Sequence, residues 1–194
     1  LALVGLLGPT LQSVDEVEKT DEISSVVNTI NAFLQSSPDI APTVGQSKFN
    51  EIYNAVENDG YATLLIFRQY QPDDEISLKI GFVGETSATV TSADVTNGSQ
   101  VLAAGTVYRA VLTPSSVIPE DHISDRGVDE YPRYTLTKAI DTYPEGYFAM
   151  EVRIFDEEPS LTYEVNLLPS GEAATPENLK GFEPVFTYNT AIVR

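Results

Sequence analysis

Residues 148–154 read FAMEVRI, and this short stretch decides the fold. Every second residue from Phe148 to Ile154 is large and apolar, and two of the three residues between them, Glu151 and Arg153, are charged. A period of two is typical of a β-strand that turns one face to a core and the other to water. The stretch therefore predicts a strand in a sheet with one buried face.

The same alternation recurs along most of the chain after residue 60. About eight strands are expected, at 61–69, 76–82, 87–95, 101–112, 133–140, 148–154, 161–167 and 183–193. Turn-forming segments such as QPDD, TNGS and YPEG separate them, and no helical pattern lies between them. Strands in such close succession predict an antiparallel β-sandwich or a jelly-roll-like domain, in a mainly β (α+β) chain.

The first 60 residues follow a different pattern. Apolar residues between Val14 and Leu34 recur near a period of 3.6, which predicts an amphipathic helix. Ser13 with Glu16 forms a capping box, so the helix is expected to start at Ser13 and to end at SSPD, residues 36–39. A second helix is expected over 47–59. This divides the chain into an N-terminal segment, 1–60, and a β-domain, 61–194.

The chain opens with LALVGLLGPT, ten residues without a charge. We expect this arm to lie against a covering surface, because an exposed apolar segment is an aggregation hazard. It could cap its own core, insert into a neighbouring subunit or touch a membrane peripherally through residues 1–12. Pro9 and Asp15 interrupt it, so no membrane span is expected. The candidate subunit-interface residues are Leu1, Leu3, Val4, Leu6, Leu7 and Leu11.

Charge limits the partners of the protein. Twenty-nine acidic residues against eleven basic ones give a formal net charge of -18, which repels nucleic acid. The acids are scattered in ones and twos, as in a solvated surface, and such a surface suits a salt-rich habitat or Ca2+. The chain has no cysteine, so disulfides and thiolate metal sites are excluded.

The longest expected connection, residues 113–132, gathers acids around the single histidine, His122. No cofactor is expected apart from possible Ca2+, which hard oxygen ligands suit, but the spacing departs from that of an EF-hand. The weak Ca2+ candidates are Asp121, Asp125, Asp129 and Glu130. The alternative is a solvated acidic loop around Arg126, with His122 exposed to solvent.

Other signals of function are weak. The ten tyrosines could stack on sugars, but most fall in or beside expected strands, where packing alone favours them. Asn97-Gly98-Ser99 matches a glycan acceptor. The sequence carries no phosphate-binding glycine loop, no paired-histidine zinc motif and no nucleophile elbow. We therefore expect a protein that is not an enzyme, with an acidic hydrolase as the alternative.

An apolar arm and helix in front of an antiparallel β-domain resembles, in architecture, the shell or tail subunits of virions and the subunits of extracellular filaments. This resemblance implies a structural subunit that binds copies of itself and other assembly subunits. We rank a virion capsid or tail protein first, then a pilus-like filament or surface-layer subunit, located on a virion or outside the cell. A pilin in the type IV style would need a longer unbroken apolar helix. A secreted carbohydrate- or Ca2+-binding module is the further alternative.

Overall fold

A computed structural model describes residues 2–35, 47–84 and 89–194, with side chains in the first helix from Lys19 onward. The helices are α1 (Ala2–Gln35), α2 (Lys48–Asp59), α3 (Ser92–Val95) and α4 (Pro176–Leu179). The strands are β1 (Ala62–Tyr70), β2 (Ile76–Phe82), β3 (Val107–Pro114), β4 (Ile123–Asp125), β5 (Tyr134–Leu136), β6 (Tyr147–Glu157) and β7 (Phe186–Val193). One-turn 3-10 helices lie at Glu120–His122 and Ile140–Thr142.

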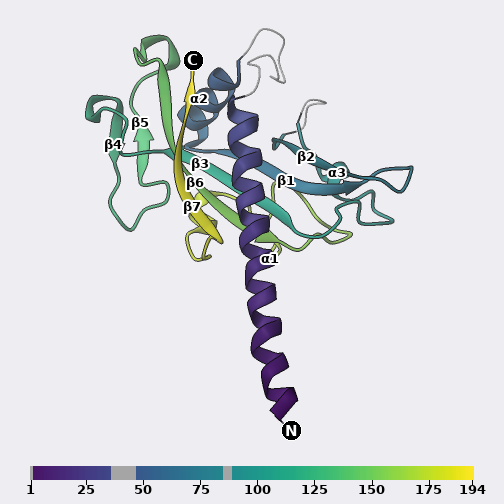
Figure 1. Ribbon diagram of the computed structural model, residues 1–194. Coiled ribbons are helices and arrows are strands. Elements are labelled where there is room, and N and C mark those ends of the chain that lie inside the picture. Colours follow the sequence, from purple (N-terminus) through teal and green to yellow (C-terminus); the bar gives the residue numbers. More distant parts are fainter. Residues whose placement is uncertain (1, 36–46, 85–88) are drawn as a thin grey trace.

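Five strands form one curled antiparallel sheet in the order β2-β1-β3-β6-β7, and β4 pairs with β5 in a small second sheet (Figure 1). The stretch FAMEVRI lies in β6, between β3 and β7, so both edges of this strand are paired. Its apolar residues are fully buried, as the alternation predicts. The expectation of a mainly β, antiparallel protein is confirmed.

Both long helices pack on the same face of the sheet. Val26, Ile30 and Leu34 of α1 share a core with Phe49 and Tyr53 of α2 and with the inward residues of β1, β3 and β6. Local chemistry sets the bounds of α2: the Ser47 hydroxyl accepts a hydrogen bond from the Asn50 amide at 3.2 Å, and Gly60 ends the helix with φ 86°. The second predicted helix is confirmed. The predicted division at residue 60 stays a prediction.

The opposite face of the sheet is covered by connections rather than by a second sheet. Tyr163, Val165, Leu168 and Leu179 from the segment after β6 are buried there, together with Val95 of α3. The predicted strand at 161–167 is therefore wrong. The described part of 87–95 contains the helix α3, which the capping box between Thr91 and Asp94 begins. A sandwich or jelly roll is not confirmed.

The start of α1 also differs from the sequence prediction. The helix begins at Ala2, and Ser13, Pro9 and Asp15 all lie within it. Proline removes only its own backbone hydrogen bond and disturbs the turn before it, at a cost of about 3 kcal/mol. Leu6, Leu7 and Leu11 near Pro9 favour helix, although Gly8 does not, and α1 continues through Pro9. The expected end at residues 36–39 lies outside the described residues.

Candidate functional site

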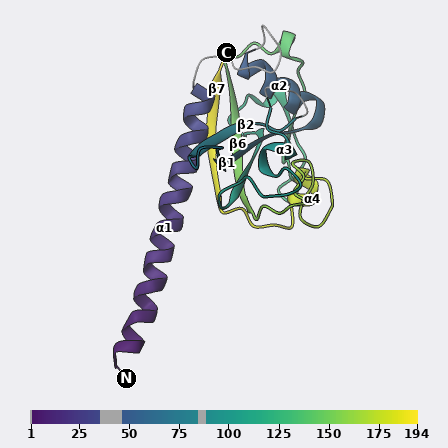
Figure 2. The same ribbon diagram turned by 90° about the vertical axis from the view of Figure 1, so that its right-hand side faces the viewer.

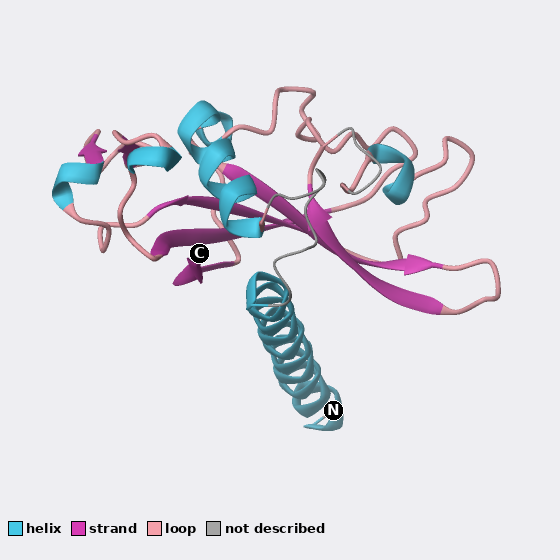
Figure 3. Cartoon of the chain, turned by 90° about the horizontal axis from the view of Figure 1, so that it is seen from above, coloured by secondary structure: helices cyan, strands magenta, loops and turns pink. Residues whose placement is uncertain are grey.

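The most unusual feature of the molecule is that α1 leaves the domain. Its second half lies against the sheet, where the buried residues begin at Val26, and its first half extends well beyond the ends of the strands (Figures 1 and 2). Viewed from above, the helix lies on one side of the curled sheet (Figure 3). The predicted interface residues, from Leu3 to Leu11, all stand on the projecting half, and Leu1 lies outside the described residues.

Polar contacts fix the second half of α1 to the domain. The hydroxyl of Tyr188 on β7 donates to the Asn31 side-chain oxygen at 3.3 Å, and burial raises the pKa of this tyrosine to about 12. The Lys48 ammonium donates to the Phe33 carbonyl near the end of the helix, and the Phe33 ring meets Phe82 edge-on at 5.5 Å. These contacts hold the direction in which the projecting half points.

A groove runs along the side of α1 that faces β7, at the place where the helix leaves the domain. It has a volume of about 390 Å³, and we call it the α1–β7 groove. Phe186, the first residue of β7, is 42% exposed beside it. Among the described side chains, those that line it are all uncharged: Thr20, Ile23, Ser24, Val27, Asn28, Val185 and Phe186.

The other side of α1 carries charged side chains. A hollow next to β1 is lined by Asp21, Glu22, Ser25 and Arg68, three of which carry charge. Ser24 and Ser25 are both exposed neighbours on the helix, yet Ser24 lines the uncharged groove and Ser25 the charged hollow. The two sides of the helix thus offer different surfaces to a partner.

The two edges of the large sheet also differ. On β2, Lys79 forms an ion pair with Asp94 of α3. Burial alone would raise the pKa of Asp94, but hydrogen bonds from Lys79 and from the Thr91 amide outweigh it and lower the pKa. β7 pairs with β6 alone among the described residues and contains no charged residue. An uncharged edge strand lacks the usual protection against pairing with another chain.

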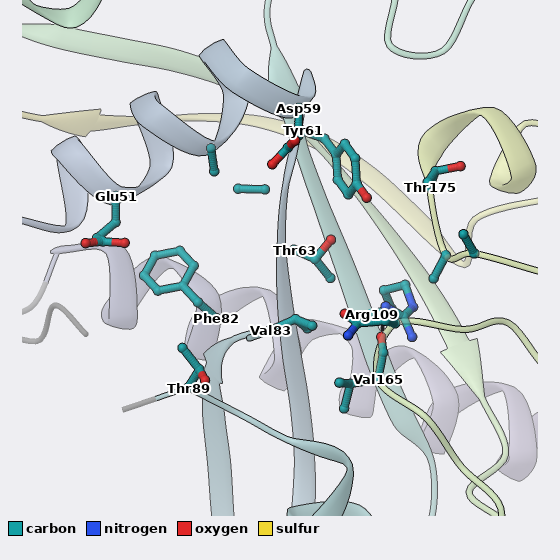
Figure 4. A pocket seen from close by; sticks show the side chains of 15 residues that line it. Glu51, Asp59, Tyr61, Thr63, Phe82, Val83, Thr89, Arg109, Val165 and Thr175 are labelled. Carbon is teal, nitrogen blue, oxygen red and sulfur yellow. Dashed lines mark hydrogen bonds between the residues drawn. The ribbon is translucent and has the colours of Figure 1, made fainter. Parts of the chain in front are cut away.

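A further hollow lies between α2, β1 and the connection after β6, and we call it the polar pocket (Figure 4). It has a volume of about 440 Å³. Glu51 and Asp59 reach it from α2, Tyr61 from the residue before β1, and Thr63 from β1. Burial raises the pKa of Glu51 and of Tyr61. A pocket of this size is typical of small-ligand sites.

Arg109 also lines the polar pocket, but its hydrogen bonds are already in use. The guanidinium donates to both carboxylate oxygens of Glu157 and, at 2.9 Å, to the Val165 carbonyl. Burial alone would lower the pKa of Arg109, but its contacts with Glu157 outweigh it and raise the pKa. We therefore assign Arg109 a structural role, which leaves carboxylates, hydroxyls and the Asn166 amide as the polar side-chain groups of the described lining.

The predicted Ca2+ candidates do not converge. Asp125 pairs with Arg133 at 2.9 Å, and Glu130 lies 3.4 Å from Arg126 and 3.6 Å from Lys180. Asp121 and Asp129 stand exposed on separate turns. No group of three or more acidic or histidine side chains with metal-binding geometry occurs in the described ranges. Calcium binding therefore stays a prediction, which these ion pairs do not favour.

His122 lies in a different setting from the expected one. It is buried rather than exposed to solvent, with its ring edge-on to Tyr143 at 5.5 Å. Its Nε2 atom lies 3.8 Å from the Glu145 carboxylate, and its buried Nδ1 atom has no hydrogen-bond partner within the described structure. The histidine therefore packs the small β4–β5 sheet against the core.

Several tyrosines are packing residues, as expected, but of the four buried ones named here only Tyr108 lies in a strand. Tyr108, Tyr131, Tyr143 and Tyr163 are buried, while Tyr61 is half-buried at the polar pocket. Asn97 lies in an exposed turn, where its side-chain oxygen accepts from the Ser99 and Gln100 amides at 3.0 and 2.9 Å. Glycosylation of Asn97 stays a prediction.

Comparison of the chain with protein-family models, with curated proteins and with solved structures finds no match. Within the described residues, no helix is long and apolar enough to cross a membrane. Sequence reasoning singled out the apolar arm, although not that it projects as a helix, and it missed the α1–β7 groove, the charged hollow and the polar pocket. The uncharged run of β7 was the one available signal for the groove, because it stands out in a chain this acidic.

Proposed function

We propose that the protein is a structural subunit of a repeating assembly, in which neighbouring copies cover the projecting half of α1. The observation that carries this proposal is the exit of α1 from the domain with an uncharged, leucine-rich end. In this proposal the protein is not an enzyme, and it is located on a virion or outside the cell.

Burial of the arm can supply a large share of the energy that joins subunits. Burial of a leucine side chain contributes about 1.5–3 kcal/mol. Burying four or five of them therefore offsets a large part of the free energy that association costs in lost entropy. Leu3, Leu7 and Leu11 follow one another at intervals of four residues. Residues with this spacing share one face of an α-helix, which suits a single continuous contact.

Among repeating assemblies, we favour a filament over a virion shell. Jelly rolls are common among viral capsid proteins, and a jelly roll is not confirmed here. A long helix that extends from one end of the domain suits stacking along an axis. The objection to a type IV-style pilin becomes weaker, because α1 continues through Pro9 and Asp15. The helix is still apolar only as far as Val14, so we place the protein in the wider class of filament subunits.

Light scattering tests the proposal. The mass of the full chain in solution is compared with that of a form lacking residues 1–12 and with that of a full-length Leu6→Asp, Leu7→Asp variant. We expect large assemblies from the full chain and monomers from both variants, with unchanged circular dichroism of the sheet. A full chain that stays monomeric at high concentration and at every salt level would refute the proposal.

A second candidate function is carbohydrate binding in the polar pocket. The half-buried ring of Tyr61 beside the Glu51 and Asp59 carboxylates offers a stacking surface and acceptors for sugar hydroxyls. Retention on a panel of immobilised polysaccharides tests it. Binding that Tyr61→Ala abolishes would support this function if Tyr70→Ala, on the exposed β1–β2 hairpin, leaves retention unchanged. No retention on any polysaccharide would remove it.

A further inference from the structure

Two uncharged surfaces stand out on this molecule of net charge -18. One is the arm, residues 1–14, which precedes the first acidic residue, Asp15. The other is the α1–β7 groove, whose seven described lining residues are all uncharged. Because copies of the chain repel one another, contacts between them cost the least electrostatic free energy where neither surface carries charge.

A chain cannot place its arm in its own groove. On α1 the groove is lined by five residues between Thr20 and Asn28, and the arm belongs to the same continuous helix. At 1.5 Å per residue, Leu7 lies about 20 Å before Thr20 along the helix axis. The helix would have to break and fold back for the arm to reach the groove, so any arm that occupies it comes from another molecule.

The dimensions of the two surfaces agree. The groove residues of α1 span eight residue-to-residue steps, from Thr20 to Asn28. The leucines of the arm span the same number, from Leu3 to Leu11. Each corresponds to about 12 Å of helix. Leu3, Leu6, Leu7 and Leu11 stand at i, i+3, i+4 and i+8. These positions belong to one face of an α-helix, the kind of face that a helix lays into a groove.

We propose that the arm of one copy docks in the α1–β7 groove of a second copy. The proposal rests on the proposed function and names the surface that receives the projecting helix. The contact joins two different surfaces, so each copy offers one arm and one groove, and the contact repeats into a ring or an open filament. The charged hollow beside Ser25 is excluded as a receptor, because Asp21, Glu22 and Arg68 would lose water against an apolar helix.

Because the chain has no cysteine, single introduced cysteines report this contact directly. Full-length Leu7→Cys is mixed with full-length Ser24→Cys, and a short bismaleimide is added under assembling conditions. We expect a crosslinked pair of unlike chains. The matched control replaces Ser24→Cys with Ser25→Cys, which puts the thiol on the charged side of the same helix, and we expect little or no crosslinking there.

A second pair of variants tests the energetics. Ser24→Glu places a carboxylate in the groove, and Ser25→Glu adds the same charge on the other side of α1. We expect Ser24→Glu to weaken association by about tenfold or more, since its charge loses water on docking, and Ser25→Glu to change association much less. Both serines are exposed, so the melting temperature of the monomer should stay unchanged.

The outcomes separate this inference from the proposed function. If the full chain assembles but crosslinks form only between arms, in Leu7→Cys alone, the groove is not the receptor and only the inference fails. Equal crosslinking at Ser24→Cys and Ser25→Cys would overturn it in the same way. A wild-type chain that never assembles would refute both.

Discussion

At the scale of single residues, the most constrained group is the buried ion pair between Arg109 of β3 and Glu157 of β6. Their side chains are 1% and 5% exposed, and the Tyr163 hydroxyl donates to the same carboxylate. Burying one charge without the other is costly, because the remaining charge has neither water nor a partner. The pair therefore fixes how the connection carrying Tyr163 lies on the sheet.

Removing one charge of this pair should destabilise the protein strongly. We expect Glu157→Gln to lower the free energy of unfolding by about 3 kcal/mol, because Arg109 then stays buried without a counter-charge. Glu151→Gln is the matched control on the same strand, since Glu151 pairs with Arg153 where both are about one-third exposed. We expect a change below about 1 kcal/mol there. Urea unfolding measures both, and equal losses would contradict a special role for Glu157.

The lowered pKa of Asp94 predicts how the stability of the protein responds to acid. Its pKa is lowered in the folded protein, so its contribution to stability is present above the unfolded value, near 3.8, and is lost as the pH falls through the lower, folded value. We expect the stability of the wild type to fall more than that of Asp94→Asn as the pH drops below about 4. Urea midpoints over an acid series measure this difference, and parallel curves would show that the Lys79 contact contributes nothing.

At the scale of elements, the sequence predicted the helices and the long strands better than the connections. The alternation identified β6 because its apolar residues on one face fill a core. The neighbouring strand β1 is buried on both faces from Leu64 to Phe67, whereas β2 leaves Ile76 and Leu78 exposed at the edge of the sheet. Residues 161–167 alternate in the same way but pack as a connection, since Tyr163 and Val165 find their partners on the far face of the sheet. Periodicity reports which residues are buried, and not whether the backbone is paired.

The second half of α1, which lies against the sheet, is expected to contribute strongly to the stability of the domain. Ile30 is fully buried between the helix and the sheet, whereas Ile76 of β2 is 55% exposed. We expect Ile30→Ala to cost about 2–5 kcal/mol of unfolding free energy, because it leaves a cavity in the core. Ile76→Ala removes the same atoms and should cost far less. Thermal and urea unfolding compare the two, and similar losses would mean that α1 is not held against the sheet.

At the scale of the whole molecule, the candidate site depends on contacts that no local pattern contains. The α1–β7 groove joins residues 20–28 with residues 185–186, and the polar pocket joins α2 with the segment after β6. Sequence reasoning identified the arm because its lack of charge is local, over residues 1–14. It could not identify the receiving surface, because Phe186 and Val27 meet only after the sheet has formed.

The net charge of -18 governs how the whole molecule associates. Screening shortens the range of repulsion between copies from about 30 Å at 0.01 M salt to about 3 Å at 1 M. The proposed contact between arm and groove is uncharged, so salt removes repulsion without weakening the contact itself. We expect the assembled mass, measured by light scattering, to grow with salt and with divalent cations. The form lacking residues 1–12 should stay monomeric throughout, whereas assemblies of the full chain that dissolve in moderate salt would mean that ion pairs hold the copies together.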